Sequence, residues 1–226
     1  MSITNTEQIR QYILKLIDAK DKDFAFKTVE TFGVSKSTVY NYVKKMCEDN
    51  ILKKIEKTSP PYELVTVTHK FQYDNNGALG EDKIFRADIQ PLLKGFEKNV
   101  FSAWQYAFTE MMNNAIEHSK AAKIAVVLST NSLKTNIVIA DNGIGIFKNI
   151  QTFLKKERNE DLTLDECVSL LFSGKFTTAE QYHSGEGIFF TSHLMDEFVI
   201  ISDDMFFSRN NFMDATAKGF NGPSST

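Results

Sequence analysis

The sequence has little of several residue types, and each shortage excludes a class of protein. Two cysteines in 226 residues, Cys47 and Cys167, are too few and too far apart for a disulfide framework or a cysteine-based metal site. No run of about 18 apolar residues occurs, so no membrane-spanning helix is expected. The N-terminus lacks a basic region followed by an apolar stretch, which argues against a secretory signal. These shortages predict a cytoplasmic protein that does not enter a membrane.

The two parts of the chain differ in the sign of their net charge. Residues 1–70 carry 12 Lys and Arg against 9 Asp and Glu, a net charge of +3, whereas residues 71–226 carry 14 against 20, a net charge of −6. The mildly basic first part permits contact with nucleic acid but does not demand it. The acidic remainder disfavours general binding to a phosphate backbone.

Enough apolar sequence is present for one to two folded domains, since 42% of residues are hydrophobic and 24% are charged. Helical spacing of apolar residues predicts three helices, over 6–18, 24–31 and 37–50. Gly33 closes the second helix and Ser35 caps the third. Residues 51–68 are predicted to form two extended segments joined by a turn that contains prolines. Three helices followed by a hairpin is the order of a winged helix-turn-helix, which we expect over residues 1–70.

The second part begins with a turn-rich stretch, residues 71–82, which we interpret as a linker. A second domain is then expected over 83–226. Its predicted elements are a long helix over 99–119, strands over 123–129 and 135–140, a helix over 188–195 and a strand over 197–202. From Ser208 onward the sequence is polar and weakly patterned.

Glu110 and Asn114 lie four residues apart on the long predicted helix, so they share one of its faces. Magnesium takes oxygen ligands and keeps several waters, so one amide oxygen together with phosphate oxygens can hold it. A carboxylate one turn away can deprotonate a water or a hydroxyl. The pair therefore suits Mg²⁺-dependent phosphate chemistry. The alternative interpretation is that both residues lie on a solvated polar face of the helix.

Two glycine-containing strings follow. Asp141 comes directly after an apolar strand, where its carboxylate can accept a hydrogen bond from the amine of adenine, and Gly143 and Gly145 let the backbone approach the base. Gly185 and Gly187 precede an apolar helix start, where backbone N–H groups favour an anion. The alternatives are a plain Asp-Asn-Gly turn and a plain helix-entry loop. Neither string has the spacing of a P-loop or of a Rossmann fingerprint.

These three strings, in this order, resemble the N, G1 and G2 boxes of the GHKL (Bergerat-fold) ATPase superfamily. The resemblance covers about residues 83–202 and implies an α/β sandwich with a mixed sheet and helices on one face. With the N-terminal module, the chain is expected to be an α+β protein. The ligands implied are ATP and Mg²⁺.

The resemblance also implies roles for individual residues. Asn114 would be the magnesium ligand, Glu110 the general base, and Asp141 the partner of the adenine amine. Gly143 and Gly145 would shape the adenine pocket. Residues 148–183 would form a lid over the phosphates, which Lys175, Gly185 and Gly187 would face.

Glutamate at position 110 helps to decide which branch of the superfamily the chain resembles. Histidine kinases usually have Asn here and need a phosphorylatable histidine on a helix ahead of the ATPase domain, where the chain has none; its histidines are His69, His118, His183 and His193. The string Asn114-Ala115-Ile116-Glu117-His118 resembles the box of anti-sigma-factor kinases. The usual final strand with a Gly-Thr pair is not evident, so the domain is either abbreviated or part of a longer protein.

The predicted third helix resembles the recognition helix of a bacterial helix-turn-helix. Residues near its N-terminal end would reach base edges; they are Ser35, Lys36, Ser37, Thr38, Tyr40 and Asn41. Lys44 and Lys45, together with Lys53, Lys54 and Lys57 of the wing, could meet phosphates. The alternative is a winged helix used for protein contact or dimerisation. Because the net charge of +3 over residues 1–70 is modest for a DNA-binding module, a homodimer would help DNA binding.

Three functions remain open on the sequence. The first is a transcriptional regulator in which an ATP-binding and ATP-hydrolysing GHKL domain controls a DNA-binding winged helix. The second is an anti-sigma-like serine/threonine kinase that uses the winged helix to dock a protein partner. The third is a scaffold that binds a nucleotide without turning it over.

Overall fold

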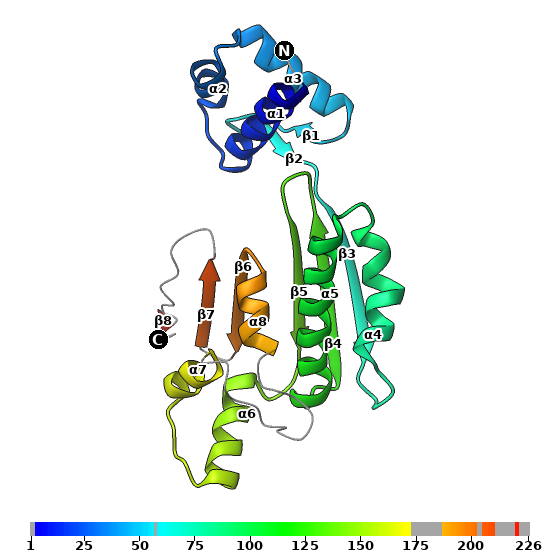
Figure 1. Cartoon of the computed structure of the whole chain (residues 1–226), viewed down its shortest axis with the longest axis vertical. Coiled ribbons are helices and arrows are strands. Elements are labelled where there is room, and N and C mark those ends of the chain that lie inside the picture. Colours follow the sequence, from blue (N-terminus) through cyan, green and yellow to red (C-terminus); the bar gives the residue numbers. More distant parts are fainter. Residues whose placement is uncertain (1–2, 57, 173–186, 203–204, 211–219, 222–226) are drawn as a thin grey trace. The chain divides into compact units, whose positions relative to one another are not determined.

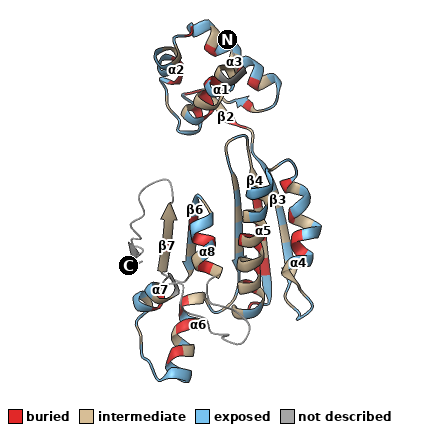
Figure 2. Ribbon diagram, in the orientation of Figure 1, coloured by how far each residue is buried: buried red, intermediate tan, exposed pale blue. Residues whose placement is uncertain are grey.

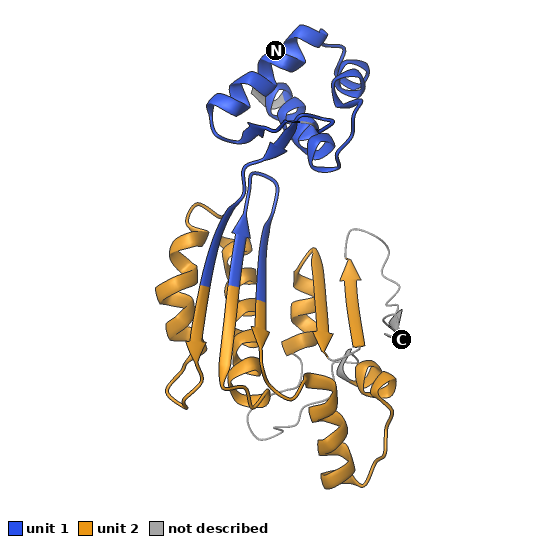
Figure 3. Cartoon of the chain, turned by 180° about the vertical axis from the view of Figure 1, so that it is seen from behind, with its two compact units in different colours: residues 1–70, 127–138 blue, residues 71–126, 139–226 orange. Residues whose placement is uncertain are grey.

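A computed structural model describes residues 3–56, 58–172, 187–202, 205–210 and 220–221 of the chain. The chain divides into two compact units, which Figure 3 distinguishes by colour. Unit 1 comprises residues 1–70 and 127–138, and unit 2 comprises residues 71–126 and 139–226. Within the residues just given, no helix is long and apolar enough to cross a bilayer.

Unit 1 contains three helices and a two-stranded antiparallel sheet, in the order that the sequence predicts. They are α1 (Ile3–Asp18), α2 (Phe24–Phe32), α3 (Lys36–Glu48), β1 (Leu52–Lys54) and β2 (Tyr62–Leu64). Gly33 ends α2 in the left-handed region, with φ 64°, and its N–H donates to the Val29 carbonyl. The Ser35 hydroxyl caps α3 by accepting the Thr38 N–H at 3.1 Å.

The core of unit 1 follows the predicted helical spacing. Its fully buried apolar side chains come from one face of α1, one face of α3 and the start of β1; they are Ile9, Ile13, Ile17, Val39, Val43, Met46 and Leu52. Burying each such side chain contributes roughly 1.5–3 kcal/mol. The opposite face of α3 is left in solvent, as the pale blue ribbon in Figure 2 shows.

A third part of unit 1 comes from much further along the chain. Strands β4 (Lys123–Thr130) and β5 (Thr135–Asp141) form a hairpin whose turn belongs to this unit. In the turn, Asn131 Oδ1 accepts the N–H groups of Leu133 and Lys134. Leu133 packs against the core of unit 1, and Lys134 Nζ lies 2.9 Å from Asp18 Oδ2. The sequence did not predict these contacts.

The other elements follow β3 (Val67–Asp74), and Figure 1 labels the α-helices and the strands among them. Before the hairpin come α4 (Glu81–Ile84), η1 (Phe85–Ile89), η2 (Gln90–Leu93), α5 (Lys98–Asn113) and η3 (Asn114–His118). After it come α6 (Ile146–Phe153), η4 (Leu154–Arg158), α7 (Leu164–Phe172), α8 (Gly187–Leu194), β6 (Glu197–Ser202), β7 (Met205–Asn210) and β8 (Phe220–Asn221). Because β3 extends to Asp74, the first residues of the stretch expected to be a linker are strand.

Apart from the two-stranded sheet of β1 and β2, the described strands form two sheets, in the orders β3-β4-β5 and β6-β7-β8, where one mixed sheet was expected. The pairs β6–β7 and β7–β8 are antiparallel. Helices α4 and α5 lie on one face of the first sheet in Figures 1 and 3. On that sheet, Ile124, Val126 and Leu128 of β4 alternate as fully buried side chains.

Strand β7 was not predicted. It pairs with β6 over six residues, and Phe207 is buried in the cluster that also contains Phe198. The sequence Met205-Phe-Phe-Ser-Arg-Asn210 alternates poorly, because Phe206 and Phe207 are adjacent. Its strand conformation depends on the pairing with β6, which a local pattern does not report.

Candidate nucleotide site

The predicted magnesium helix changes its geometry at the predicted ligand. Helix α5 ends at Asn113, and the π-helical turn η3 begins at Asn114. The Asn114 N–H is bonded to the carbonyls of both Glu110 and Met111. Widened turns of this kind recur at functional sites, because they re-aim the side chains that follow. Glu110 and Asn114 are both half-buried, whereas Phe108 and Met112 on the other face are buried.

Residues predicted for the N and G2 boxes meet at the start of α8. Gly187 is the first residue of this helix, and a Cβ built on it would overlap Glu110 Oε2 and lie 3.0 Å from Glu110 Cδ. The Glu110 carboxylate therefore rests directly against the Gly187 backbone. Only glycine permits so close an approach, and a helix N-terminus is a favourable place for a negative charge.

The predicted adenine partner, Asp141, is the last residue of β5, and its side chain is exposed. Its Oδ1 accepts the Gly143 N–H at 2.8 Å, which folds the chain into an Asx turn. The two glycines of this loop are needed for different reasons. Gly145 has φ 80°, whereas a Cβ on Gly143 would overlap the Ser119 carbonyl oxygen and lie 2.8 Å from Asp141 Oδ1.

The loop predicted to bind adenine is bonded to the end of the helix predicted to hold magnesium. The Ile144 N–H donates to the Ser119 carbonyl at 2.8 Å, and Asn149 Nδ2 of α6 donates to the His118 carbonyl at 3.1 Å. The structure thus brings the end of the N box and the G1 string together. Sequence reasoning missed Ser119 and Asn149, since nothing in their local pattern distinguishes them from other polar surface residues.

The predicted lid region, residues 148–183, contains most of α6, all of η4 and all of α7, and its last residues, 173–183, lie outside the described part of the chain. A capping box begins α7: Glu166 Oε2 accepts the Thr163 N–H at 2.8 Å, and Thr163 Oγ1 accepts the Glu166 N–H at 3.3 Å. The bond from the Thr163 backbone lowers the pKa of Glu166. At the start of α6, the Ile146 N–H donates to Ser202 Oγ of β6.

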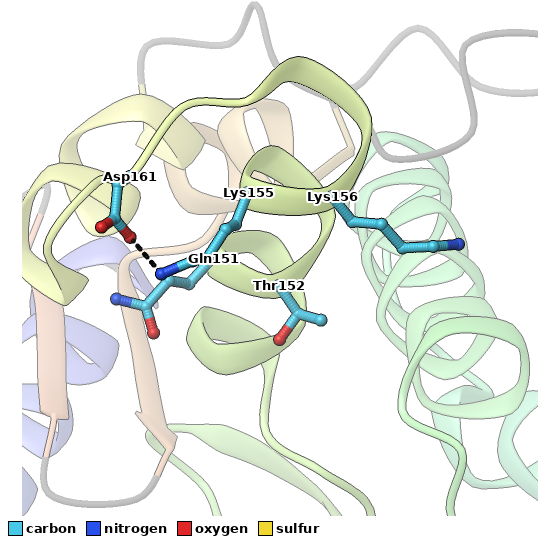
Figure 4. Close-up of a pocket in the computed structure, with 5 residues that line it drawn as sticks. All are labelled: Gln151, Thr152, Lys155, Lys156 and Asp161. Atoms are coloured by element: carbon cyan, nitrogen blue, oxygen red, sulfur yellow. Dashed lines mark hydrogen bonds and ion pairs between the residues drawn. The ribbon is translucent and has the colours of Figure 1, made fainter.

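A hollow of about 350 Å³ lies beside α6 and η4, and Figure 4 shows the residues that line it. They are Gln151, Thr152, Lys155, Lys156 and Asp161. Lys155 is paired with Asp161 at 3.0 Å, so part of its charge is neutralised. None of the residues predicted to bind the nucleotide lines this hollow, and we do not assign the nucleotide to it.

Two predicted phosphate contacts, Lys175 and Gly185, lie outside the residues that the structure describes. Within that part of the chain, no group of three or more His, Cys, Asp or Glu side chains is placed to hold a metal ion. A magnesium ion held by one amide oxygen, phosphates and water needs no such group. The half-buried Asn114 and the close-packed Gly187 backbone are chemically suited to Mg²⁺ and a polyphosphate.

The predicted DNA-contact residues lie on or beside the solvent face of α3. Lys36, Tyr40, Asn41 and Lys44 are exposed, whereas the hydroxyls of Ser37 and Thr38 lie 2.7 and 2.8 Å from the Ser35 hydroxyl, within the cap. Lys45 pairs with Asp49 at 2.9 Å, which raises the pKa of Lys45. Lys53 of β1 pairs with Glu63 across the two-stranded sheet, and Lys57 lies outside the described residues.

Helix α5 ends at Asn113, directly before Asn114, the loop after β5 carries a carboxylate with glycines beside it, and the Glu110 carboxylate lies against the first glycine of α8. Residues 85–205 match the family model described as a histidine kinase-like ATPase domain, and the chain belongs to this family. Domains of this family bind ATP. No curated protein and no solved structure was found to match the chain.

Proposed function

We propose that this protein is a cytoplasmic, ATP-hydrolysing regulator in which the histidine kinase-like ATPase domain controls a DNA-binding winged helix in unit 1. The observation that carries the enzymatic half is the contact between Glu110 and Gly187. It joins the carboxylate proposed as general base to the helix start proposed to hold the phosphates. A general base must lie within hydrogen-bonding distance of the water that it deprotonates, and this contact would place Glu110 near a water beside the phosphates.

In this proposal each motif holds one part of the nucleotide. Asp141 accepts a hydrogen bond from the adenine amine, and Gly143 and Gly145 form the backbone wall beside the base. Asn114 supplies its amide oxygen to Mg²⁺, which when bound neutralises phosphate charge. Lys175, Gly185 and Gly187 face the phosphates, where a lysine and helix N–H groups stabilise negative charge.

Hydrolysis then needs one proton acceptor. Glu110 takes a proton from the attacking water, whose oxygen forms a bond to the γ-phosphorus while the bond to the β–γ bridging oxygen breaks. The products are ADP and inorganic phosphate. Replacement of Glu110 by Gln keeps the shape of the side chain but removes its basicity, so we expect ATP binding within about threefold of wild type and phosphate release reduced about 100-fold or more. Unchanged phosphate release would exclude Glu110 as the base.

The DNA-binding half rests on the exposed stripe of α3, which carries Lys36, Tyr40, Asn41 and Lys44. In winged-helix proteins the third helix enters the major groove, and residues of its first turns read base edges. Lys44 and Lys54 would contact phosphates. The modest net charge of +3 over residues 1–70 favours binding as a homodimer, because two modules double the number of phosphate contacts.

The coupling of the two halves is supported by the division of the β4–β5 hairpin between the units. Its turn, with Leu133 and Lys134, packs within unit 1, whereas Asp141 at the end of β5 belongs to unit 2. In the proposal, ATP held by Asp141 alters the ordering of β5, and the hairpin carries this change to the winged helix. This is an energetic coupling through a shared element.

A serine/threonine protein kinase is the second candidate, favoured by the string Asn114–His118, which resembles that of anti-sigma-factor kinases. In that case Glu110 would activate a partner's hydroxyl in place of water, and unit 1 would dock the partner. Incubation with γ-labelled ATP and candidate partner proteins separates the two functions. A labelled protein product supports the kinase, and free phosphate alone supports the ATPase.

A further inference from the structure

The segment that connects the magnesium helix to β4, residues 116–123, is held from both sides by asparagine side chains. On one side, Asn75 Nδ2, directly after β3, donates to the carbonyls of Ile116 and Ala121 at 2.9 and 3.1 Å. On the other side, Asn142 Oδ1 accepts the N–H groups of Ala122 and Lys123 at 3.0 and 2.9 Å. In Figure 1 the end of α5, the start of β4 and the end of β5 lie at the same end of the sheet.

The two asparagines act at different ends of the proposed nucleotide site. Asn75 bonds Ile116, which lies in the π-helical turn that begins with Asn114. Asn142 stands between Asp141 and Gly143, and its backbone N–H also donates to the Lys123 carbonyl at 3.3 Å. Asn75 is therefore tied to the magnesium end, and Asn142 to the adenine end.

Their hydrogen-bond roles are opposite. Asn75 uses only its side-chain donor in these bonds, and the side chain is half-buried; Asn142 uses only its acceptor, and the side chain is exposed. From this geometry we infer that Asn75 and Asn142 are positioning residues: Asn75 sets Asn114 for the metal, and Asn142 sets Asp141 for adenine. The inference deepens the proposed function and rests on its assignment of the nucleotide site.

The same substitution should have different effects at the two positions. Asn142→Asp keeps an oxygen that accepts both N–H groups, so we expect ATP affinity within about threefold of wild type, since solvent screens the added charge. Asn75→Asp removes both donated bonds and places a carboxylate against two carbonyl oxygens. The two carbonyl oxygens would lose their hydrogen-bond donor, and such a loss at a half-buried site should weaken Mg²⁺-dependent ATP binding about tenfold or more.

The readout is ATP affinity with Mg²⁺ and with excess EDTA, from which the ratio of the two dissociation constants is taken. A variant that only lowers the folded fraction changes both constants by one factor and leaves the ratio unchanged. We expect Asn75→Asp and Asn75→Ala to reduce the Mg²⁺ enhancement about tenfold. Asn142→Ala should weaken binding about fivefold in both conditions with the enhancement unchanged.

The matched control is Asn76→Asp, because Asn76 is the next residue and accepts only the Ala78 N–H. It should equal wild type in both conditions. Should Asn75→Asp fail to fold by circular dichroism, Asn75→Ala tests the same bonds without an added charge. The inference would be overturned if Asn75→Asp and Asn142→Asp had equal effects, or if an Asn75 variant kept the full Mg²⁺ enhancement. Either result would leave the proposed function intact. A wild-type protein that binds ATP in neither condition would overturn the proposed function as well.

Discussion

The solvent face of α3 and the nucleotide site are assembled in opposite ways. The α3 face comes from one helix, Lys36–Glu48, whose exposed residues follow directly from the buried stripe on its other side. The proposed nucleotide site is built from the end of α5, the loop after β5 and the start of α8, joined by backbone hydrogen bonds and glycine contacts. In the first region a substitution removes one contact; in the second it displaces groups from elsewhere in the chain.

The largest effect is expected at Asp141. Asp141→Ala removes the proposed acceptor of the adenine amine and leaves a polar group of the base without a partner, so ATP affinity should fall about 100-fold or more. Calorimetry measures this change. The control is Asp74→Ala, which removes a carboxylate that ends β3 as Asp141 ends β5, but which pairs with Lys123. Equal losses in the two variants would refute the assignment.

A single methyl group at position 187 should disturb the site almost as much. Gly187→Ala places a Cβ where Glu110 lies, so the carboxylate must move away from the start of α8. We expect phosphate release to fall about tenfold or more, because the proposed base is displaced. Gly80→Ala is the matched control, since the nearest atom to its Cβ would be Lys83 Cδ at 3.9 Å. Full activity of Gly187→Ala would show that Glu110 need not rest there.

On α3 the effects should be smaller and separable. Lys44→Ala should reduce affinity for duplex DNA about fivefold and lower the slope of log affinity against log salt by about 1. Lys45→Ala should change affinity less than about twofold, because Lys45 pairs closely with Asp49 at 2.9 Å, whereas Lys44 lies 4.0 Å from its nearest carboxylate, that of Glu48. Fluorescence anisotropy at several salt concentrations measures both. Should the two lysines contribute equally, the assignment of Lys44 to a phosphate would lose its support.

The smallest effect is expected at the turn between β4 and β5. Lys134→Glu turns the pair with Asp18 into a repulsion at an exposed position, which should lower the free energy of unfolding by about 1 kcal/mol or less. The double variant Lys134→Glu with Asp18→Lys should restore it. Urea unfolding of the four proteins gives the coupling energy. A coupling energy of zero would mean that the pair contributes nothing to the docking of the turn.

The sequence predicted the parts of this structure that depend on local pattern. The helices α1, α2, α3, α5 and α8 and the strands β4, β5 and β6 all lie close to their predicted positions. Most of them could be predicted because their apolar residues recur at one clear period, whereas α8 was predicted from an apolar run that follows a glycine. The family, which the comparison confirms over residues 85–205, was recognised from three short strings.

What the sequence could not predict depends on partners that are distant along the chain. The division of the strands into two sheets and the strand β7 are set by pairing, not by local propensity. Asn75 appeared only as a turn former within a linker, because its bonds are to carbonyls some forty residues later. The same holds for Leu133, an exposed-looking turn residue by pattern that packs in the core of unit 1.

The most direct test of the regulatory claim is the affinity of the wild-type protein for a fluorescent duplex, measured with and without Mg²⁺ and a non-hydrolysable ATP analogue. Coupling of about 1 kcal/mol or more predicts at least a fivefold change in the dissociation constant. Asp141→Ala, which should not bind the analogue, should show no change. An identical dissociation constant for the wild-type protein in both conditions, with the analogue shown to be bound, would contradict the account.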